Sequence, residues 1–135
     1  MSCVFCAIAK GETPAHVVLE DEKVVAFLDA KPLFLGHVLV VPRAHVATLV
    51  ELPDDTLGPL FARVRDLARA VPVAMGAQGT FVAMNNVVSQ SVPHLHVHVV
   101  PRTKGDGLKG FFWPRTKYPN DDAMRAVAAK IRAAI

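Results

Sequence analysis

Histidine alternates with aliphatic residues in one short segment of this chain, Pro93-His94-Leu95-His96-Val97-His98-Val99-Val100-Pro101-Arg102. In a β-strand, successive side chains point to opposite faces. A strand here would carry three histidines on one face and Leu95, Val97 and Val99 on the other. Packing gives no reason to align three groups that each titrate near neutral pH, so a surface strand with incidental histidines is the disfavoured alternative. The pattern therefore predicts a strand with one core face and one chemical face.

Composition and charge limit what kind of protein this is. The chain has 135 residues, of which 52% are hydrophobic, and its mean hydropathy of +0.32 fits one compact domain with a real core. Its apolar stretches stop short of the roughly 20 residues that span a membrane, and its first residues do not form a signal peptide. We therefore expect a cytoplasmic protein with no membrane partner. The net charge of +3 is scattered, which favours small anions over nucleic acid, since nucleic acid requires a dense basic stripe.

Residue alternation and turn residues predict a sheet. Two strands over residues 16–20 and 23–28 flank Asp21-Glu22 and form a predicted hairpin. The segment 36–42 is nearly all apolar, as expected for a strand buried on both faces, so it should lie centrally. A further strand is expected over 79–85.

Helical spacing predicts three helical segments. Residues 4–10 form one or two turns. A long helix begins at Pro53-Asp54-Asp55, carries an apolar stripe that packs on the sheet, and is expected to end at Pro72 and Gly76. A last amphipathic helix runs from Asn120, its N-cap, to the final residue. Antiparallel strands with helices on one side give an α+β fold.

The two cysteines, Cys3 and Cys6, form a Cys-x-x-Cys motif at the start of the chain. A structural disulfide is not expected in a cytoplasmic protein, which leaves a redox pair, half of a metal site, or two buried thiols. A thioredoxin-like pair follows a strand, and nothing of the kind precedes Cys3. Metal is the favoured interpretation, with inert thiols as the alternative. Tetrahedral zinc then needs two more ligands, for which histidines are the strong candidates.

The histidine segment resembles the His-x-His-x-His-x-x signature of the histidine triad family, in which x is apolar. The resemblance extends to Phe27-Leu28-Asp29, to Gly36–His45 and to Gln90-Ser91-Val92, and it covers roughly residues 3–102. It implies the family's fold, a five-stranded antiparallel sheet with two main helices, and the family's usual homodimer.

The resemblance makes residues 1–135 one HIT domain, with a core over 3–102 and a C-terminal loop and helix over 103–135. The C-terminal part contains three consecutive aromatic residues, Phe111, Phe112 and Trp113. Exposed aromatics of this size would form an apolar patch on a small monomer. Together with the family fold, they predict a homodimer.

A reaction is also implied by the resemblance. Family members bind a nucleoside monophosphoryl group, and the central histidine attacks the α-phosphorus to form a nucleotidyl-histidine that water hydrolyses. His96 matches this nucleophile, because an imidazole with one free nitrogen can attack at neutral pH. His98 matches the histidine at the leaving group, a role suited to proton donation. Gln90 and Ser91 match polar groups near the phosphate, and His37 matches a supporting histidine.

The nucleoside site follows from the same resemblance. Asp29 matches the carboxylate that binds the ribose hydroxyls, and either Asn85 or Asn86 is expected near the phosphate. Four apolar residues match the walls around a purine base: Phe5, Ile8, Phe27 and Leu28. An apolar slot does not distinguish adenine from guanine. The segment from Asn86 to Gln90 is shorter than in many members and lacks glycine, so the phosphate loop departs from the family pattern.

Zinc is the implied cofactor. Some family members complete a Cys-x-x-Cys motif with a histidine after the Gly-His strand and with the first histidine of the triad. Cys3, Cys6, His45 and His94 occupy these places. Four such ligands fill a tetrahedral site, so the resemblance predicts a structural zinc that joins the N-terminus to the catalytic strand.

The predicted function is a nucleotide hydrolase or transferase. Its leaving group is an amine, as in a purine nucleoside phosphoramidate, or a phosphorylated group, as in a dinucleoside polyphosphate. The alternative is a nucleotide-binding regulatory dimer with little turnover. Repair of nucleic-acid ends is disfavoured, because the chain lacks a basic run and is too short for an added DNA-binding module.

Overall fold

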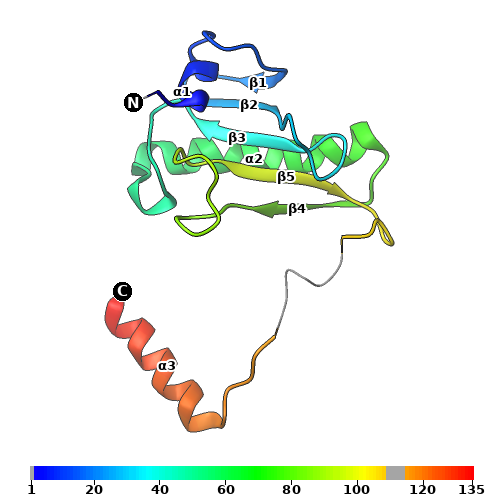
Figure 1. The fold of residues 1–135 in the computed structure, drawn as a ribbon. Helices are drawn as coiled ribbons and strands as arrows, with labels where there is room; N and C mark the ends of the chain where they lie inside the picture. The colour runs from blue at the N-terminus through cyan, green and yellow to red at the C-terminus, as the bar shows by residue number, and fades with distance from the viewer. Residues whose placement is uncertain (1, 109–114) are drawn as a thin grey trace. The chain divides into compact units, whose positions relative to one another are not determined.

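The structure, a computed structural model, describes residues 2–108 and 115–135 (Figure 1). The chain forms two compact units, Met1–Lys104 and Gly105–Ile135. The aromatic residues expected at a dimer interface, Phe111, Phe112 and Trp113, lie outside the described residues. No helix in the described ranges is long and apolar enough to cross a membrane, and the cytoplasmic location stays a prediction.

Five antiparallel strands form the sheet of the first unit, in the order β1-β2-β3-β5-β4 (Figure 1). They are β1 (Val17–Glu20), β2 (Val24–Leu28), β3 (Val38–Pro42), β4 (Gly79–Ala83) and β5 (Val97–Arg102). Every residue of β3 is buried and β3 is the middle strand, which confirms the predicted central strand. The predicted β1–β2 hairpin is also confirmed. Its turn is closed by Asp21, whose Oδ1 accepts the backbone N–H groups of Lys23 and Val24.

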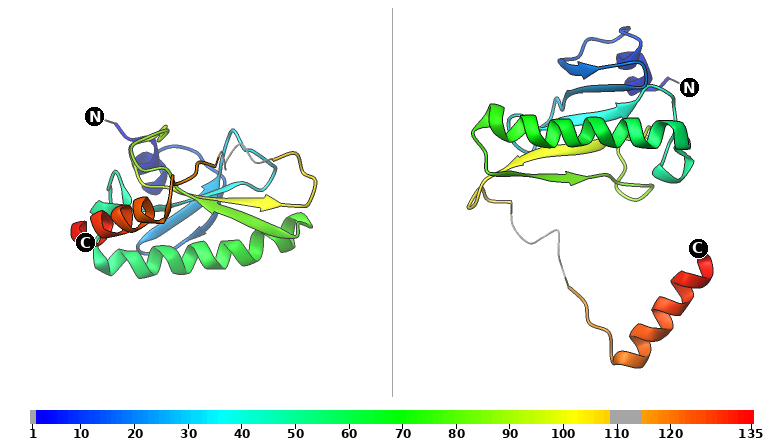
Figure 2. Two further views of the ribbon diagram at one scale, coloured as in Figure 1. Left: turned by 90° about the horizontal axis from the view of Figure 1, so that it is seen from below. Right: turned by 180° about the vertical axis from the view of Figure 1, so that it is seen from behind.

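The long helix α2 (Asp54–Met75) covers one face of the sheet, as the view from below in Figure 2 shows. Its buried apolar residues are Leu60, Val64, Leu67 and Val71. They share one core cluster with Leu95, Val97 and Val99, all of which are fully buried. The aliphatic half of the histidine segment therefore faces α2, as the alternation predicted.

The prediction that Pro72 ends this helix is wrong, because α2 continues to Met75 and ends at Gly76 in the left-handed conformation (φ 64°). Pro59 also lies inside the helix. A proline has no N–H, so it leaves the carbonyl four residues earlier without its helical partner. For Pro59 that carbonyl belongs to Asp55, and it accepts a hydrogen bond from Lys23 Nζ at 2.8 Å.

The expectation of helices on one side only is also wrong, since the short helix α1 (Val4–Ala9) lies on the face opposite α2 (Figure 2). Phe5 packs there in a second core cluster with Val25, Phe27, Leu39 and Val41. Arg43 fixes the end of α1, because its Nη1 donates to the Ala9 carbonyl at 2.6 Å. The 3-10 helix η1 (Leu49–Glu51) connects β3 to α2.

The second unit contains α3 (Asp121–Ala134), the other of the two longer helices. Asn120 is its N-cap and accepts a hydrogen bond from the Ala123 N–H, as predicted. Arg125 pairs with Asp121 and Asp122 in the first turn. None of the residues of α3 is buried.

Candidate active site and metal centre

The histidine segment enters the sheet later than predicted. Strand β5 begins at Val97, so His94 and His96 precede it and only His98 lies within it. The segment is held before the strand by the Leu95 N–H, which donates to the Val46 carbonyl at 2.8 Å. The rings of His96 and His98 still lie side by side, with their centroids 5.0 Å apart.

His96 is held in one tautomer. Its Nδ1 lies 2.8 Å from the backbone carbonyl oxygen of His94, and a carbonyl only accepts, so Nδ1 carries the proton. The lone pair is then on Nε2. The residue is 4% exposed, and its ring stands edge-on to Phe5, with centroids 5.1 Å apart. This is the protonation pattern that a histidine nucleophile requires.

His37 and His98 are joined by a hydrogen bond whose direction can be assigned. The Leu33 N–H donates to His37 Nδ1 at 3.1 Å, so the proton of His37 is on Nε2. That nitrogen donates to His98 Nδ1 at 2.9 Å, and the proton of neutral His98 is therefore on its own Nε2. His37 thus selects the tautomer of His98.

Both His37 and His98 are neutral near pH 7. Burial lowers the pKa of His37 below its usual value, the Asp29 carboxylate acts in the opposite direction, and His96 lowers it further. Burial also lowers the pKa of His98 to about 4, with smaller contributions in the same direction from His96 and His37.

An open cavity of about 850 Å³ is lined by His96 and His98 but not by His37. Eight of the predicted site residues line it: Phe5, Ile8, Phe27, Leu28, Asp29, Ser91, His96 and His98. The wall is apolar along α1 and β2, and its polar residues are His16, Asp29, Lys31, Ser91, His96 and His98. A second cavity of about 690 Å³ shares Val4, Ser91 and Val92 with the first.

The four predicted zinc ligands also converge. The Nδ1 atom of His94 lies 3.4 Å from Cys3 Sγ, 3.4 Å from Cys6 Sγ and 3.2 Å from His45 Nδ1. Cys6 Sγ lies 3.2 Å from His45 Nδ1. Zinc bonds of about 2.0 Å to nitrogen and 2.3 Å to sulfur place two tetrahedral nitrogen ligands about 3.3 Å apart and a nitrogen and a sulfur ligand about 3.5 Å apart, so these distances fit the ion.

The tautomer of His94 agrees with this role. Its Nε2 lies 2.8 Å from the Pro42 carbonyl oxygen and must donate to it, which leaves the Nδ1 lone pair facing the two sulfur atoms. Burial also lowers the pKa of His94, which favours the neutral ring that a metal binds. The Cys3 Sγ in addition accepts the Cys6 N–H at the start of α1.

The HIT domain model matches residues 10–105 of the chain. This protein belongs to the histidine triad family. The adenosine 5′-monophosphoramidase hnt1 of Schizosaccharomyces pombe is 33% identical over 138 residues, which cover 100% of this chain and 99% of that protein.

Two solved structures support the assignment to the HIT family. A HIT family protein from Bacillus subtilis has 31% identity and a TM-score of 0.89, over 100% of this chain and 98% of that chain. A zinc-bound histidine triad family protein from Mycobacterium smegmatis has 36% identity and a TM-score of 0.76, over 100% of this chain and 99% of that chain. The five-stranded antiparallel sheet that the resemblance implied is thereby confirmed as the HIT fold.

Three predicted phosphate-site residues of the HIT protein bind backbone instead of lining either cavity. The Gln90 side chain donates to the Ala47 carbonyl at 2.6 Å and accepts the Val87 N–H at 2.9 Å. Asn86 Oδ1 accepts the Leu49 N–H at 2.8 Å. Asn85 Nδ2 donates to the Ser89 carbonyl at 3.2 Å. These amides shape the loop before the triad in this structure.

The same loop is strained. Val87 and Ser89 have φ angles of 72° and 60°, in the left-handed region that favours glycine. This is where the sequence lacks the glycine of many family members. A β-branched residue such as Val87 is especially disfavoured there.

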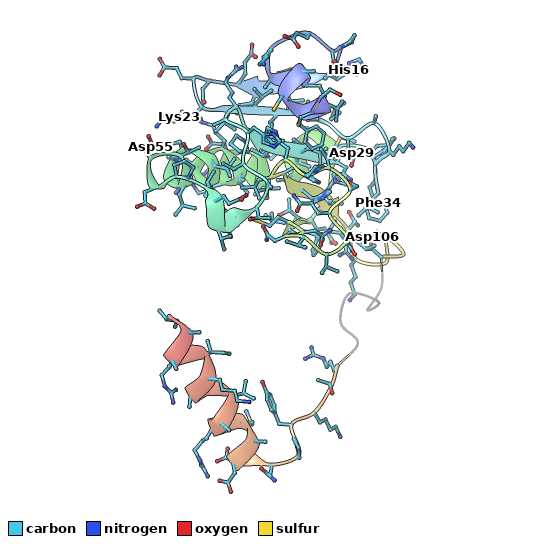
Figure 3. All side chains as sticks on the ribbon, turned by 60° about the vertical axis from the view of Figure 1, so that its left-hand side comes forward. His16, Lys23, Asp29, Phe34, Asp55 and Asp106 are labelled. Atoms are coloured by element: carbon cyan, nitrogen blue, oxygen red, sulfur yellow. The ribbon has the colours of Figure 1, made fainter. Side chains whose placement is uncertain are left out.

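Sequence reasoning missed two polar residues of the cavity wall, His16 and Lys31. Figure 3 labels His16 and Asp29, which lie along the same side of the first unit. His16 is next to the first residue of β1, and Lys31 follows Asp29 by two positions. No motif marks either residue, so only the folded chain could reveal that they border the site.

Proposed function

We propose that this HIT protein hydrolyses purine nucleoside 5′-phosphoramidates through a nucleotidyl intermediate on His96. The observation that carries the proposal is the His96 tautomer, because the 2.8 Å contact of Nδ1 with the His94 carbonyl leaves an unprotonated Nε2 beside the cavity. The phosphoramidase name of the S. pombe relative supports a nucleotide substrate and a hydrolase reaction.

The reaction has two steps on this geometry. In the first, His96 Nε2 attacks the α-phosphorus, a new N–P bond forms, and the P–N bond to the leaving amine breaks. The leaving amine takes a proton from solvent in the open cavity, and the neutral His98 ring donates a hydrogen bond from Nε2, the nitrogen that the His37 contact leaves protonated. In the second, water attacks the phosphorus, His96 departs, and a nucleoside 5′-monophosphate is released.

The nucleoside lies in the apolar part of the cavity in this proposal. Phe5 and Phe27, with ring centroids 5.4 Å apart, form part of the base wall with Ile8 and Leu28. Asp29 accepts hydrogen bonds from the ribose hydroxyls, and the Ser91 hydroxyl lies near the phosphoryl group. The loop of Asn85, Asn86 and Gln90 supports the site through its backbone.

Zinc is a structural cofactor in this proposal. Cys3, Cys6, His45 and His94 would supply four ligands to the ion, which would leave no position for a reacting water. Bound there, zinc would hold the N-terminus against His94, the residue whose carbonyl orients His96. The description of the M. smegmatis relative as zinc-bound supports this assignment.

We further propose that the protein is a homodimer. Strand β4 is at an edge of the sheet, and its Val82 is exposed. On α2, which packs beside β4, Leu57 and Phe61 are also exposed. An open strand edge next to exposed apolar side chains favours pairing with a second copy. Light scattering at micromolar concentration should give twice the mass of the chain, and the monomer mass would contradict the dimer.

The function is tested by comparing the hydrolysis of adenosine 5′-phosphoramidate with that of a diadenosine polyphosphate. Wild-type protein should release AMP from the phosphoramidate with the higher kcat/KM. The His96→Ala variant, verified as folded by circular dichroism, is the blank and should lose nearly all turnover while still binding AMP. Substantial turnover by folded His96→Ala would exclude His96 as the nucleophile. AMP binding by the wild type without turnover of either substrate would favour a nucleotide-binding regulatory protein.

A further inference from the structure

The second cavity lies beside the proposed reaction centre. It has a volume of about 690 Å³ and shares Val4, Ser91 and Val92 with the first cavity, which His96 lines. The proposed function places the Ser91 hydroxyl near the phosphoryl group, so a substrate at His96 reaches the place where the two cavities meet. The nucleoside occupies the first cavity in that proposal, and the second cavity has no assigned occupant.

Helix α1 separates the two cavities. Val4 is 47% exposed and lines both of them, whereas Ala7 lines only the second and Ile8 only the first. Residues three and four positions further along a helix lie on either side of the starting residue, because one turn takes 3.6 residues. The Val4 side chain therefore lies at the border, and the two cavities are neighbouring compartments of one open site.

Hydrogen bonds hold the walls of the second cavity in place. The Thr13 N–H donates to the Ala7 carbonyl at 3.4 Å, which joins the segment after α1 to the helix. On the other side, the Gln90 side chain donates to the Ala47 carbonyl at 2.6 Å. Gln90 precedes Ser91 in the chain, so this contact joins the Ala47 wall to the border between the cavities. These contacts give the second cavity fixed walls.

The lining of the second cavity suits an uncharged occupant. Its described residues include no lysine, arginine, aspartate or glutamate, and most of its side chains are aliphatic or carry a hydroxyl. The remaining two, Cys3 and His45, are predicted zinc ligands, and two thiolates would balance the charge of a bound Zn²⁺. A polyphosphate carries several negative charges, which proteins usually bind with cationic side chains or metal ions. A neutral, largely apolar group fits this lining better.

The direction of the displacement favours the leaving group as the occupant. In an in-line displacement at phosphorus, the leaving group departs on the side away from the nucleophile. His96 lines the first cavity and not the second. We propose that the second cavity binds the organic substituent of the leaving amine, so that the protein prefers nucleoside phosphoramidates whose amine carries an uncharged, apolar group. The inference rests on the proposed function and adds a class of leaving group to it.

The kinetic test compares the N-methyl and N-hexyl phosphoramidates of adenosine. Methylamine and hexylamine are almost equally basic, so the two substrates differ in the size and apolar surface of the leaving group and not in the chemistry of P–N cleavage. A buried methylene contributes about a fourfold factor in binding, so the wild type should cleave the N-hexyl substrate with a kcat/KM at least about tenfold higher. Equal kcat/KM values for the two substrates overturn the inference.

Two variants fill the second cavity from different walls. Ala7→Leu and Ala47→Leu each add apolar volume there and replace no residue that lines the first cavity. Each should remove most of the N-hexyl preference and keep the wild-type kcat/KM for the N-methyl substrate. Elemental analysis of zinc and circular dichroism show whether each variant keeps its metal centre and its fold.

The matched control is Ala70→Leu, the same change at an exposed position of α2, which covers the opposite face of the sheet (Figure 2). This control should keep the full N-hexyl preference. A preference that persists in both folded cavity variants overturns the inference.

A measurement on the wild type needs neither turnover nor a variant. In adenosine 5′-alkylphosphonates a carbon replaces the leaving nitrogen, so these compounds bind without being cleaved, and the ethyl and heptyl compounds match the two substrates in length. The methyl signals of Ala7 and Ala47 are followed by NMR as either compound is added. The heptyl compound should shift both signals more than the ethyl compound does, whereas Ala15, which lines only the first cavity, should respond equally to the two.

Equal responses of Ala7 and Ala47 to the two phosphonates overturn the inference. Absence of phosphoramidate cleavage would instead reject the proposed function, and the phosphonate comparison would still decide what the second cavity binds.

Discussion

Acid sensitivity is the most direct consequence of the buried histidine chain. The folded protein keeps His98 neutral down to about pH 4, whereas an unfolded chain binds a proton on this histidine near its usual value of 6.5. Between these values the unfolded state holds more protons, so the free energy of unfolding falls as the pH falls from 6.5 toward 4. Above pH 6.5 the effect is absent.

The magnitude follows from the two pKa values. Each pKa unit corresponds to about 1.4 kcal/mol, so the difference between 6.5 and about 4 corresponds to about 3 kcal/mol at pH values below both. Between pH 7 and pH 4.5, His98 alone should lower the free energy of unfolding by about 2 kcal/mol. With a urea m-value of about 2 kcal/mol/M, this loss lowers the urea concentration at the unfolding midpoint by about 1 M.

The assay is urea unfolding at pH 7.0, 5.5 and 4.5 for the wild type and His98→Asn, both with a chelator. The chelator is needed because protonation of zinc ligands also weakens metal binding in acid. The asparagine Oδ1 replaces His98 Nδ1 as the acceptor for His37, but it does not titrate. As the pH falls from 7.0 to 4.5, the free energy of unfolding of the wild type should decrease by about 2 kcal/mol more than that of His98→Asn.

A parallel pH dependence of the two proteins would refute this reasoning. It would mean that His98 is solvated enough in the folded protein to bind its proton at an ordinary pH. His37 contributes with the same sign, since burial lowers its pKa too, so some acid sensitivity should remain in His98→Asn.

Three further outcomes are expected. Protein purified without chelator should contain about one zinc per chain by elemental analysis. The Cys3→Ser variant should have a lower zinc content and a lower melting temperature, whereas His96→Ala should keep its zinc. Val87→Gly should leave stability unchanged or raise it by up to about 1 kcal/mol in urea unfolding, because relief of the strain at φ 72° offsets the entropy of glycine; a clear loss would contradict the strain. Leu60→Ala should lower the free energy of unfolding by about 2–5 kcal/mol, since this side chain is fully buried under the sheet, and a loss below 1 kcal/mol would contradict that packing.

The sequence by itself determined the elements whose signal is local. Alternation along the histidine segment predicted which side chains enter the core, because the two faces of an extended chain are fixed by its period of two. The apolar run of β3 predicted a central strand, and the side chain of Asn120 predicted the start of α3. The Cys-x-x-Cys motif with histidines at the family's positions predicted the set of four side chains that converge.

Tertiary contacts decided what local signals could not. Helix α2 passes through Pro59 because Lys23, from the β1–β2 turn, supplies a partner for the carbonyl that the proline releases, and this contact joins residues 32 positions apart. The burial of Val71 against the sheet accompanies the continuation of the helix through Pro72. Propensity is a weak preference that packing overrides.

The choice of tautomers also came from the tertiary structure alone. The sequence shows that the three histidines are present, but it does not show which backbone groups lie beside their ring nitrogens. The His94 carbonyl, the Leu33 N–H and the Pro42 carbonyl select the protonated nitrogen of His96, His37 and His94 respectively. Two of these contacts are local, but each requires a backbone geometry that the whole fold imposes. Alternation and the family resemblance indicated which histidines belong to the site, and the folded backbone decided which nitrogen of each ring carries the proton.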